Sequence, residues 1–71
     1  MDYEMLLNEV LNIGKEMLKS GAETDRAEDS MYRMLESYDL EQCSIFAIQS
    51  DIQATIKPKN GSFITQIRRV H

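Results

Sequence analysis

Apolar residues in the first part of the chain recur at spacings of three and four, which is the pattern of an amphipathic helix. This stripe comprises Tyr3, Leu6, Leu7, Val10, Ile13, Met17 and Leu18. Gly21 follows the last apolar position and suits a left-handed helix end. The pattern therefore predicts a helix over about residues 3–20. Gly14 inside it costs about 1 kcal/mol relative to alanine, which indicates either a close crossing by the second helix or plain tolerance.

A second helical pattern begins after Gly21. Thr24 or Asp25 can cap its start, and Glu28 follows Asp25 at the spacing of a capping box. We expect a helix over about residues 24–38, with no glycine to mark its end. Its apolar stripe comprises Ala27, Met31, Met34, Leu35 and Tyr38.

From Cys43 onward the pattern changes to that of β-strands. Residues 43–49, 52–57 and 62–70 are rich in strand formers, and the middle run separates apolar from polar positions most cleanly. The segments Gln-Ser-Asp (49–51) and Pro-Lys-Asn-Gly-Ser (58–62) can turn one strand into the next. The predicted fold is α+β, with two N-terminal helices packed on a three-stranded antiparallel β-meander in the order α-α-β-β-β.

The first predicted strand is apolar on both faces. Cys43, Ile45 and Ala47 point one way, whereas Phe46 and Ile48 point the other. A strand of this kind is typical of a sheet that is covered on both sides, and two helices can cover only one. We therefore expect that the chain self-associates, or that it is a fragment of a larger α+β domain.

Length and composition favour a single small domain. Of the 71 residues, 42% are hydrophobic and 28% are charged, which is typical of an ordered globular protein. The only cysteine, Cys43, excludes an internal disulfide and a zinc site built on several cysteines. The sequence has no secretory signal pattern and no run of the ~20 apolar residues that a membrane helix needs. These features predict a soluble chain in a reducing, cytoplasmic setting.

Charge is divided unevenly along the chain. Residues 1–41 carry 11 acidic and 4 basic side chains, whereas residues 42–71 carry 1 and 4, and the net charge is −4. The acidic half argues against nucleic acid as a partner, because such binding needs clustered Lys and Arg. Arg68 and Arg69 fall on opposite faces of the third strand, so that one can meet the acidic helices while the other faces solvent.

No catalytic centre, cofactor or metal is predicted. His71 is the only histidine and is terminal, Cys43 lies in a strand, and the three glycines are too far apart for a phosphate-binding loop. We therefore expect a protein that is not an enzyme by itself.

An acidic cluster, made of Asp25, Glu28 and Asp29, opens the second helix. Its spacing can present oxygen ligands to an ion or paired carboxylates for acid–base chemistry. Acids in a first helical turn are also stabilised by the helix dipole, and Asp29 and Arg33 have the spacing of an ordinary surface ion pair. Spacing alone leaves both interpretations open.

The stretch Gly-Ala-Glu-Thr-Asp-Arg-Ala-Glu-Asp, residues 21–29, resembles the N-terminal soluble domain of the threonine/serine exporter family. The family pattern continues into a small strand region that ends in Arg and Val, as at Arg69 and Val70 here, so the resemblance covers nearly the whole chain. Ala27 stands where a larger apolar residue is usual. The matching residues of the stretch are Gly21, Ala22, Glu23, Thr24, Arg26, Glu28 and Asp29.

The resemblance implies a cytoplasmic domain that precedes a bundle of membrane helices, which exports threonine and serine. Family members continue past the Arg-Arg-Val segment with more soluble sequence, so we expect the chain to be truncated, which would leave its first strand uncovered. The resemblance also allows a hydrolase-like activity, to which no residue is assigned.

Three functions are consistent with these observations. The first is a non-catalytic module that supports amino-acid export, with the membrane part of the same exporter and a second copy of the chain as partners. The second is a hydrolase-like or ligand-binding domain, in which Arg26 binds the carboxylate of threonine or serine and acidic side chains bind its ammonium. The third is a free-standing protein–protein interaction module. The candidate ligand-binding residues are Glu23, Thr24, Arg26, Glu28 and Asp29.

Overall fold

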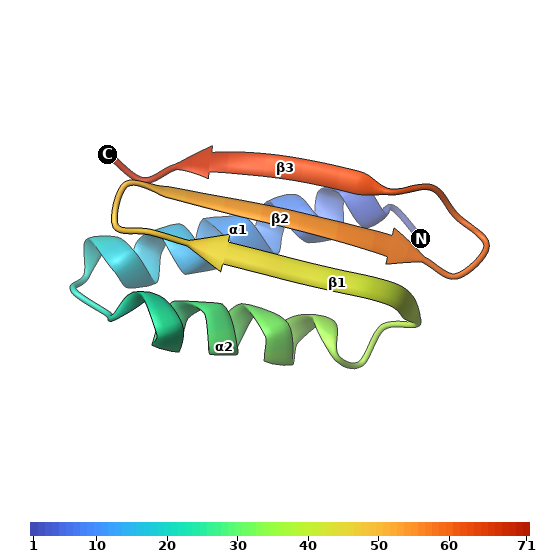
Figure 1. The fold of residues 1–71 in the computed structure, drawn as a ribbon, viewed down its shortest axis with the longest axis horizontal. Helices are drawn as coiled ribbons and strands as arrows, with labels where there is room; N and C mark the ends of the chain where they lie inside the picture. The colour runs from blue at the N-terminus through green and yellow to red at the C-terminus, as the bar shows by residue number, and fades with distance from the viewer.

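The computed structural model describes residues 1–71 as two helices followed by one sheet. The helices are α1 (Tyr3–Lys19) and α2 (Thr24–Leu35), and the strands are β1 (Leu40–Ala47), β2 (Asp51–Pro58) and β3 (Ile64–Arg69). The strands form an antiparallel meander in the order β1-β2-β3. Both helices lie on the same side of the sheet, with α1 behind β2 and β3 and α2 alongside β1 (Figure 1). The predicted α-α-β-β-β fold is confirmed.

Several element boundaries differ from the predicted ones. Helix α2 ends at Leu35 rather than 38, because Tyr38 N–H bonds to Leu35 C=O at 3.1 Å in a tighter turn. Strand β1 begins at Leu40 rather than 43, because Leu40 pairs with Pro58 across a register shift that the apolar alternation does not reveal. Strand β3 covers 64–69 rather than 62–70, and beyond it Val70 N–H bonds to Ser50 C=O at 2.8 Å.

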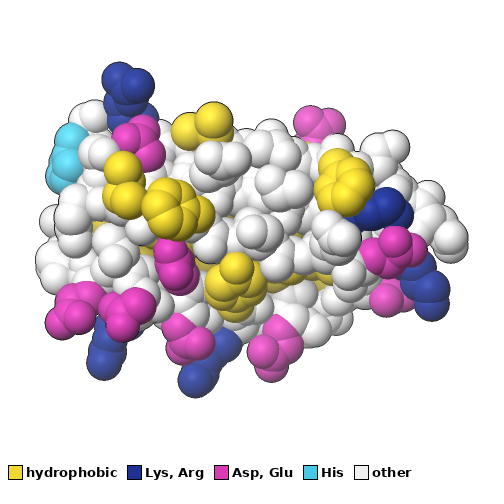
Figure 2. All heavy atoms as spheres, viewed as in Figure 1, with side chains coloured by type: hydrophobic (Ala, Val, Ile, Leu, Met, Phe, Trp, Pro, Cys, Tyr) yellow, Lys and Arg dark blue, Asp and Glu magenta, His cyan; other side chains and the backbone are white.

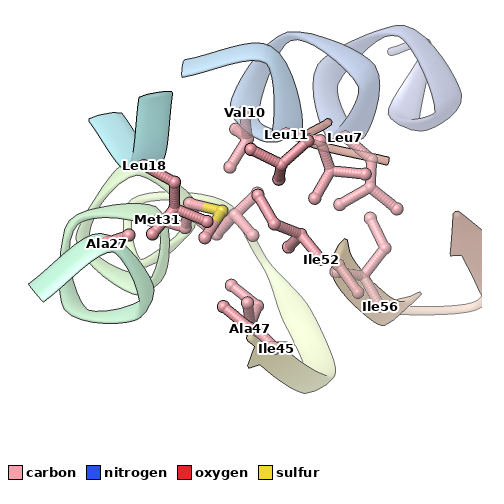
Figure 3. Close-up of a cluster of buried hydrophobic side chains, with 13 residues drawn as sticks. Leu7, Val10, Leu11, Leu18, Ala27, Met31, Ile45, Ala47, Ile52 and Ile56 are labelled. Carbon is pink, nitrogen blue, oxygen red and sulfur yellow. The ribbon is translucent and has the colours of Figure 1, made fainter. Parts of the chain in front are cut away.

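The hydrophobic core lies between the helices and the inner face of the sheet. Leu7 and Leu11 of α1 point toward Ile52 and Ile56 of β2, and Met31 of α2 lies beside them (Figure 3). These five side chains are fully buried. No charged or polar residue is buried in this core, so hydrophobic burial is its main source of stability.

Gly14 of α1 packs directly against Met31 of α2. A Cβ atom at Gly14 would lie 2.5 Å from Sδ of Met31 and 3.2 Å from Cδ1 of Ile52. Of the two explanations for a glycine inside α1, a close crossing by the second helix is therefore confirmed. Real Cβ atoms do not approach other atoms this closely, so a larger residue would push Met31 away.

The opposite face of the sheet is not covered by any element of the chain. Ile45 and Ala47 of β1 face the helices and are buried, whereas Phe46 between them is 61% exposed. Ile67 of β3 is 66% exposed on the same face. Figure 2 shows the hydrophobic side chains on this side as separate groups rather than one continuous patch, with charged side chains next to some of them. The apolar inner face of the first strand is confirmed, whereas Phe46 is the only apolar residue on the outer face of β1, because the strand ends at Ala47 and Ile48 lies beyond it. What covers the outer face stays a prediction.

Candidate functional site

The stretch of residues 21–29 begins with the end of α1. Gly21 has a φ of +97°, the left-handed conformation that glycine adopts without strain. Its N–H bonds to Leu18 C=O at 3.1 Å, and Ala22 N–H bonds to Met17 C=O at 3.0 Å. This pair of bonds is a Schellman motif, and it satisfies two carbonyl groups at the helix end. The predicted role of Gly21 as a helix stop is confirmed.

Helix α2 starts immediately after this turn, with Glu23 as its N-cap residue. The Glu23 carbonyl accepts the Ala27 N–H at 3.0 Å, but its side chain does not cap the helix. Neither Thr24 nor Asp25 is the cap, and the predicted capping box is wrong. The capping box does not form because the Glu28 carboxylate points toward β1 instead of back to the start of its own helix.

Glu28 and Tyr32, one helical turn apart, bind the free edge of β1. The Ala47 N–H donates to Oε2 of Glu28 at 2.7 Å, and the Ile45 N–H donates to the Tyr32 hydroxyl at 2.7 Å. The same hydroxyl donates to the Ile45 carbonyl at 3.3 Å. Because β1 is an edge strand, these groups would otherwise be open to pairing with another chain. Glu28 therefore fixes α2 against the sheet.

Reasoning from sequence missed Tyr32 altogether. A signal was present, since Glu28 and Tyr32 are four residues apart on one helix face and border the apolar stripe. A polar group at the border of a buried stripe can reach backbone groups of the neighbouring layer. Which strand would lie there, and in which register, was not visible in the helix pattern.

The other charged residues of the stretch point outward. Asp29 forms an exposed ion pair with Arg33, at 3.1 Å between Oδ2 and Nε, and Asp25 accepts the N–H of Arg26 at 2.9 Å. The side chains of Glu23 and Arg26 are exposed and have neither an ion pair nor a hydrogen bond. The candidate residues are thus close in space but divided between two helix faces. A polar depression of about 510 Å³ on the outward face is lined by Asp25, Arg26, Asp29, Ser30 and Arg33.

The two arginines of β3 lie on opposite faces of the sheet, as predicted. Arg68 points toward α1, where it hydrogen-bonds the side chains of Asn8 and Asn12 rather than those of acidic residues. Arg69 lies on the outer face, 3.8 Å from Asp51. These contacts join β3 to α1 and to β2, and both arginines therefore have partners within the chain.

Two further hollows lie outside the acidic cluster. An open groove of about 690 Å³ follows the last turns of α1 and includes Gly21 and Ala22. A smaller apolar pocket of about 260 Å³ lies between the end of α2 and the start of β1 and includes Tyr32, Tyr38 and Cys43. Burial raises the pKa of the Cys43 thiol above its ordinary value, so this thiol is a poor nucleophile at neutral pH.

Neither helix has the length and apolar content needed to cross a bilayer. The structure also contains no group of three or more His, Cys, Asp and Glu side chains arranged to hold a metal ion.

Comparison with known proteins supports one assignment. The model of the family described as "Putative threonine/serine exporter" matches residues 9–71. The chain has no significant match among curated proteins or among solved structures. The family match includes all three strands, all of α2 and most of α1. The chain therefore belongs to the threonine/serine exporter family.

Proposed function

We propose that this chain is a soluble module on the cytoplasmic face of the membrane, and that it supports threonine or serine export without catalysis of its own. The observation that carries the proposal is that the family match extends across most of α1 and all the other elements of the αα-βββ unit. The apolar stripes of both helices are used within this unit, since Leu7, Leu11, Met31 and Leu35 have at most 1% of their surface exposed. In the proposal, separate membrane-spanning segments of the intact exporter carry the transport path.

Within this module, the stretch of residues 21–29 has two tasks. Gly21 and Glu28 build the joint between α1 and α2 and hold α2 against β1. The side chains of Glu23 and Arg26 take no part in that joint, and their charged groups are exposed at the same end of α2. We assign to this pair the contact with the rest of the exporter or with the transported amino acid.

The test is efflux of threonine and serine from cells that express the complete exporter gene. Arg26→Ala and Glu23→Ala are expected to reduce efflux at equal protein level, because they remove free charges without touching the core. Lys19→Ala and Glu9→Ala are matched controls, since both residues are exposed on α1 outside the stretch. Unchanged efflux in both Arg26→Ala and Glu23→Ala would contradict the proposed role of this pair.

A ligand-binding function is the second candidate, and the polar depression beside Arg26 favours it. The guanidinium of Arg26 can bind the carboxylate of a zwitterionic amino acid, and the carboxylates of Glu23 and Asp29 can bind its ammonium. In this proposal Thr24 and Glu28 position the helix. Titration of the 15N-labelled chain with threonine, serine and Mg²⁺ should shift the amide signals of residues 23–33. No shift with any of the three would remove this candidate.

A further inference from the structure

The face of the sheet that points away from the helices, called here the outer sheet face, has a regular arrangement of side chains. The strand register places Phe46 beside Gln53 and Gln53 beside Ile67, so that two large apolar residues flank a polar one in a row across the strands. The adjacent row contains only small residues, Ser44, Thr55 and Thr65. The two threonines of this row share a hydrogen bond of 2.9 Å between their hydroxyl groups.

The central strand carries opposite charges at its two ends on this same face. Asp51 opens β2 and Lys57 lies near its end, and alternation along the strand puts both on the outer sheet face. Each already has a partner within the chain, because Asp51 is 3.8 Å from Arg69 and Lys57 is 2.8 Å from Glu41. Each end of β2 on the outer sheet face therefore carries a pair of opposite charges, and β2 itself contributes the acidic member at one end and the basic member at the other.

We propose that the outer sheet face is the interface of a symmetric homodimer, in which two sheets pack face to face about a two-fold axis that crosses the strands near Ala54. This axis places each row of large residues over the partner's row of small ones. Phe46 lies over the partner's Ser44, and Ile67 lies over the partner's Thr65. Large side chains opposite small ones let two layers interdigitate, as the facing sheets of β-sandwiches do.

The charges select this axis over the other possible one. With the two-fold axis across the strands, Asp51 meets the partner's Lys57 at both ends of the interface. The ion pairs within each chain then join across the interface into a row of alternating acidic and basic side chains. With an axis along β2, Asp51 would face the partner's Asp51 and Lys57 the partner's Lys57. Like charges in direct opposition disfavour that second arrangement.

The size of the face predicts a weak dimer. Three strands about 4.8 Å apart and about eight residues long at about 3.3 Å each make a face of roughly 14 by 26 Å. The area of this face is smaller than the ~800 Å² that each partner contributes to a standard stable interface. We therefore expect reversible association rather than a permanent dimer, whether or not the chain has the transport role proposed above.

Sedimentation equilibrium of the 71-residue chain over a hundredfold range of concentration tests the proposal. The average mass should rise from the monomer value of 8.2 kDa toward twice that value. Phe46→Asp and Ile67→Asp should remain monomeric, because each would place a charge in the interface. Met5→Asp is the matched control, since Met5 is 58% exposed on α1 and should leave association unchanged. A monomer at every concentration, or a dimer that persists in both sheet variants, would overturn the proposal.

The axis can be tested separately by NMR on a mixture of labelled and unlabelled chains. The proposed axis predicts an intermolecular contact between the Ile67 and Thr65 methyl groups. A contact between the Ile67 methyl and the Phe46 ring of the other chain would show the axis along the strands instead, and would overturn the proposed packing. Circular dichroism of the Asp variants distinguishes lost association from lost folding.

Discussion

At the scale of single residues, Gly14 decides how closely the two helices approach. Alanine at this position favours the helix by about 1 kcal/mol, but its Cβ would displace Met31 from a filled core, and overpacking costs about 1–3 kcal/mol. We expect Gly14→Ala to lower the free energy of unfolding by about 1 kcal/mol in urea denaturation. In a Met31→Ala background the same change should destabilise the chain less, since the two closest atoms are gone and only Cδ1 of Ile52, at 3.2 Å, has to shift. An equal effect in both backgrounds would show that Met31 is not the cause.

Burial of Cys43 makes the stability of the chain depend on pH. Its raised pKa means that the folded chain keeps the thiol proton at a pH where the unfolded chain, with an ordinary pKa of about 8.5, has lost it. The contribution of this thiol to stability is therefore fully present below the ordinary pKa. It is lost as the pH rises from that value through the raised pKa of the folded chain. The difference in unfolding free energy between the natural chain and Cys43→Ala should shrink from about pH 7 to about pH 10. A difference that is constant over this range would contradict the assignment.

At the scale of secondary structure, α2 protects the edge of β1. Tyr32→Phe removes the hydroxyl that pairs with both backbone groups of Ile45, which should cost about 1–2 kcal/mol of stability and speed hydrogen exchange at the Ile45 amide. Tyr38→Phe is the matched control, because the Tyr38 hydroxyl makes no hydrogen bond in the structure. Equal effects of the two substitutions would show that the edge is not held by Tyr32.

Secondary-structure elements differ in how far their own sequence determines them. The element order, the stop at Gly21 and the cover on only one face of the sheet could be predicted, because each depends on local spacing. The function of Glu28 could not, since its hydrogen bond joins residues 19 positions apart and depends on the register of β1. The same limit explains the early start of β1, where Leu40 pairs with Pro58 without any alternation in the sequence.

At the scale of the whole molecule, a core formed on one side of a three-stranded sheet makes stability dependent on what covers the other side. Only folded chains can associate through the outer sheet face, so dimer formation stabilises the folded state by mass action. Above the dissociation constant, each tenfold rise in concentration adds about 0.7 kcal/mol per protomer, which for a chain of this size raises Tm by about 3–5 °C. Calorimetry at several concentrations measures this shift directly.

The Phe46→Asp chain should have a Tm that does not depend on concentration, because Phe46 is exposed in the monomer and contributes through association. At low concentration, where both chains are monomeric, its stability should be close to that of the natural chain. A large loss at low concentration would mean instead that Phe46 stabilises the monomer. A Tm of the natural chain that stays constant across concentrations would show that self-association does not contribute to the stability of the fold. This result would contradict the proposed dimer at the outer sheet face.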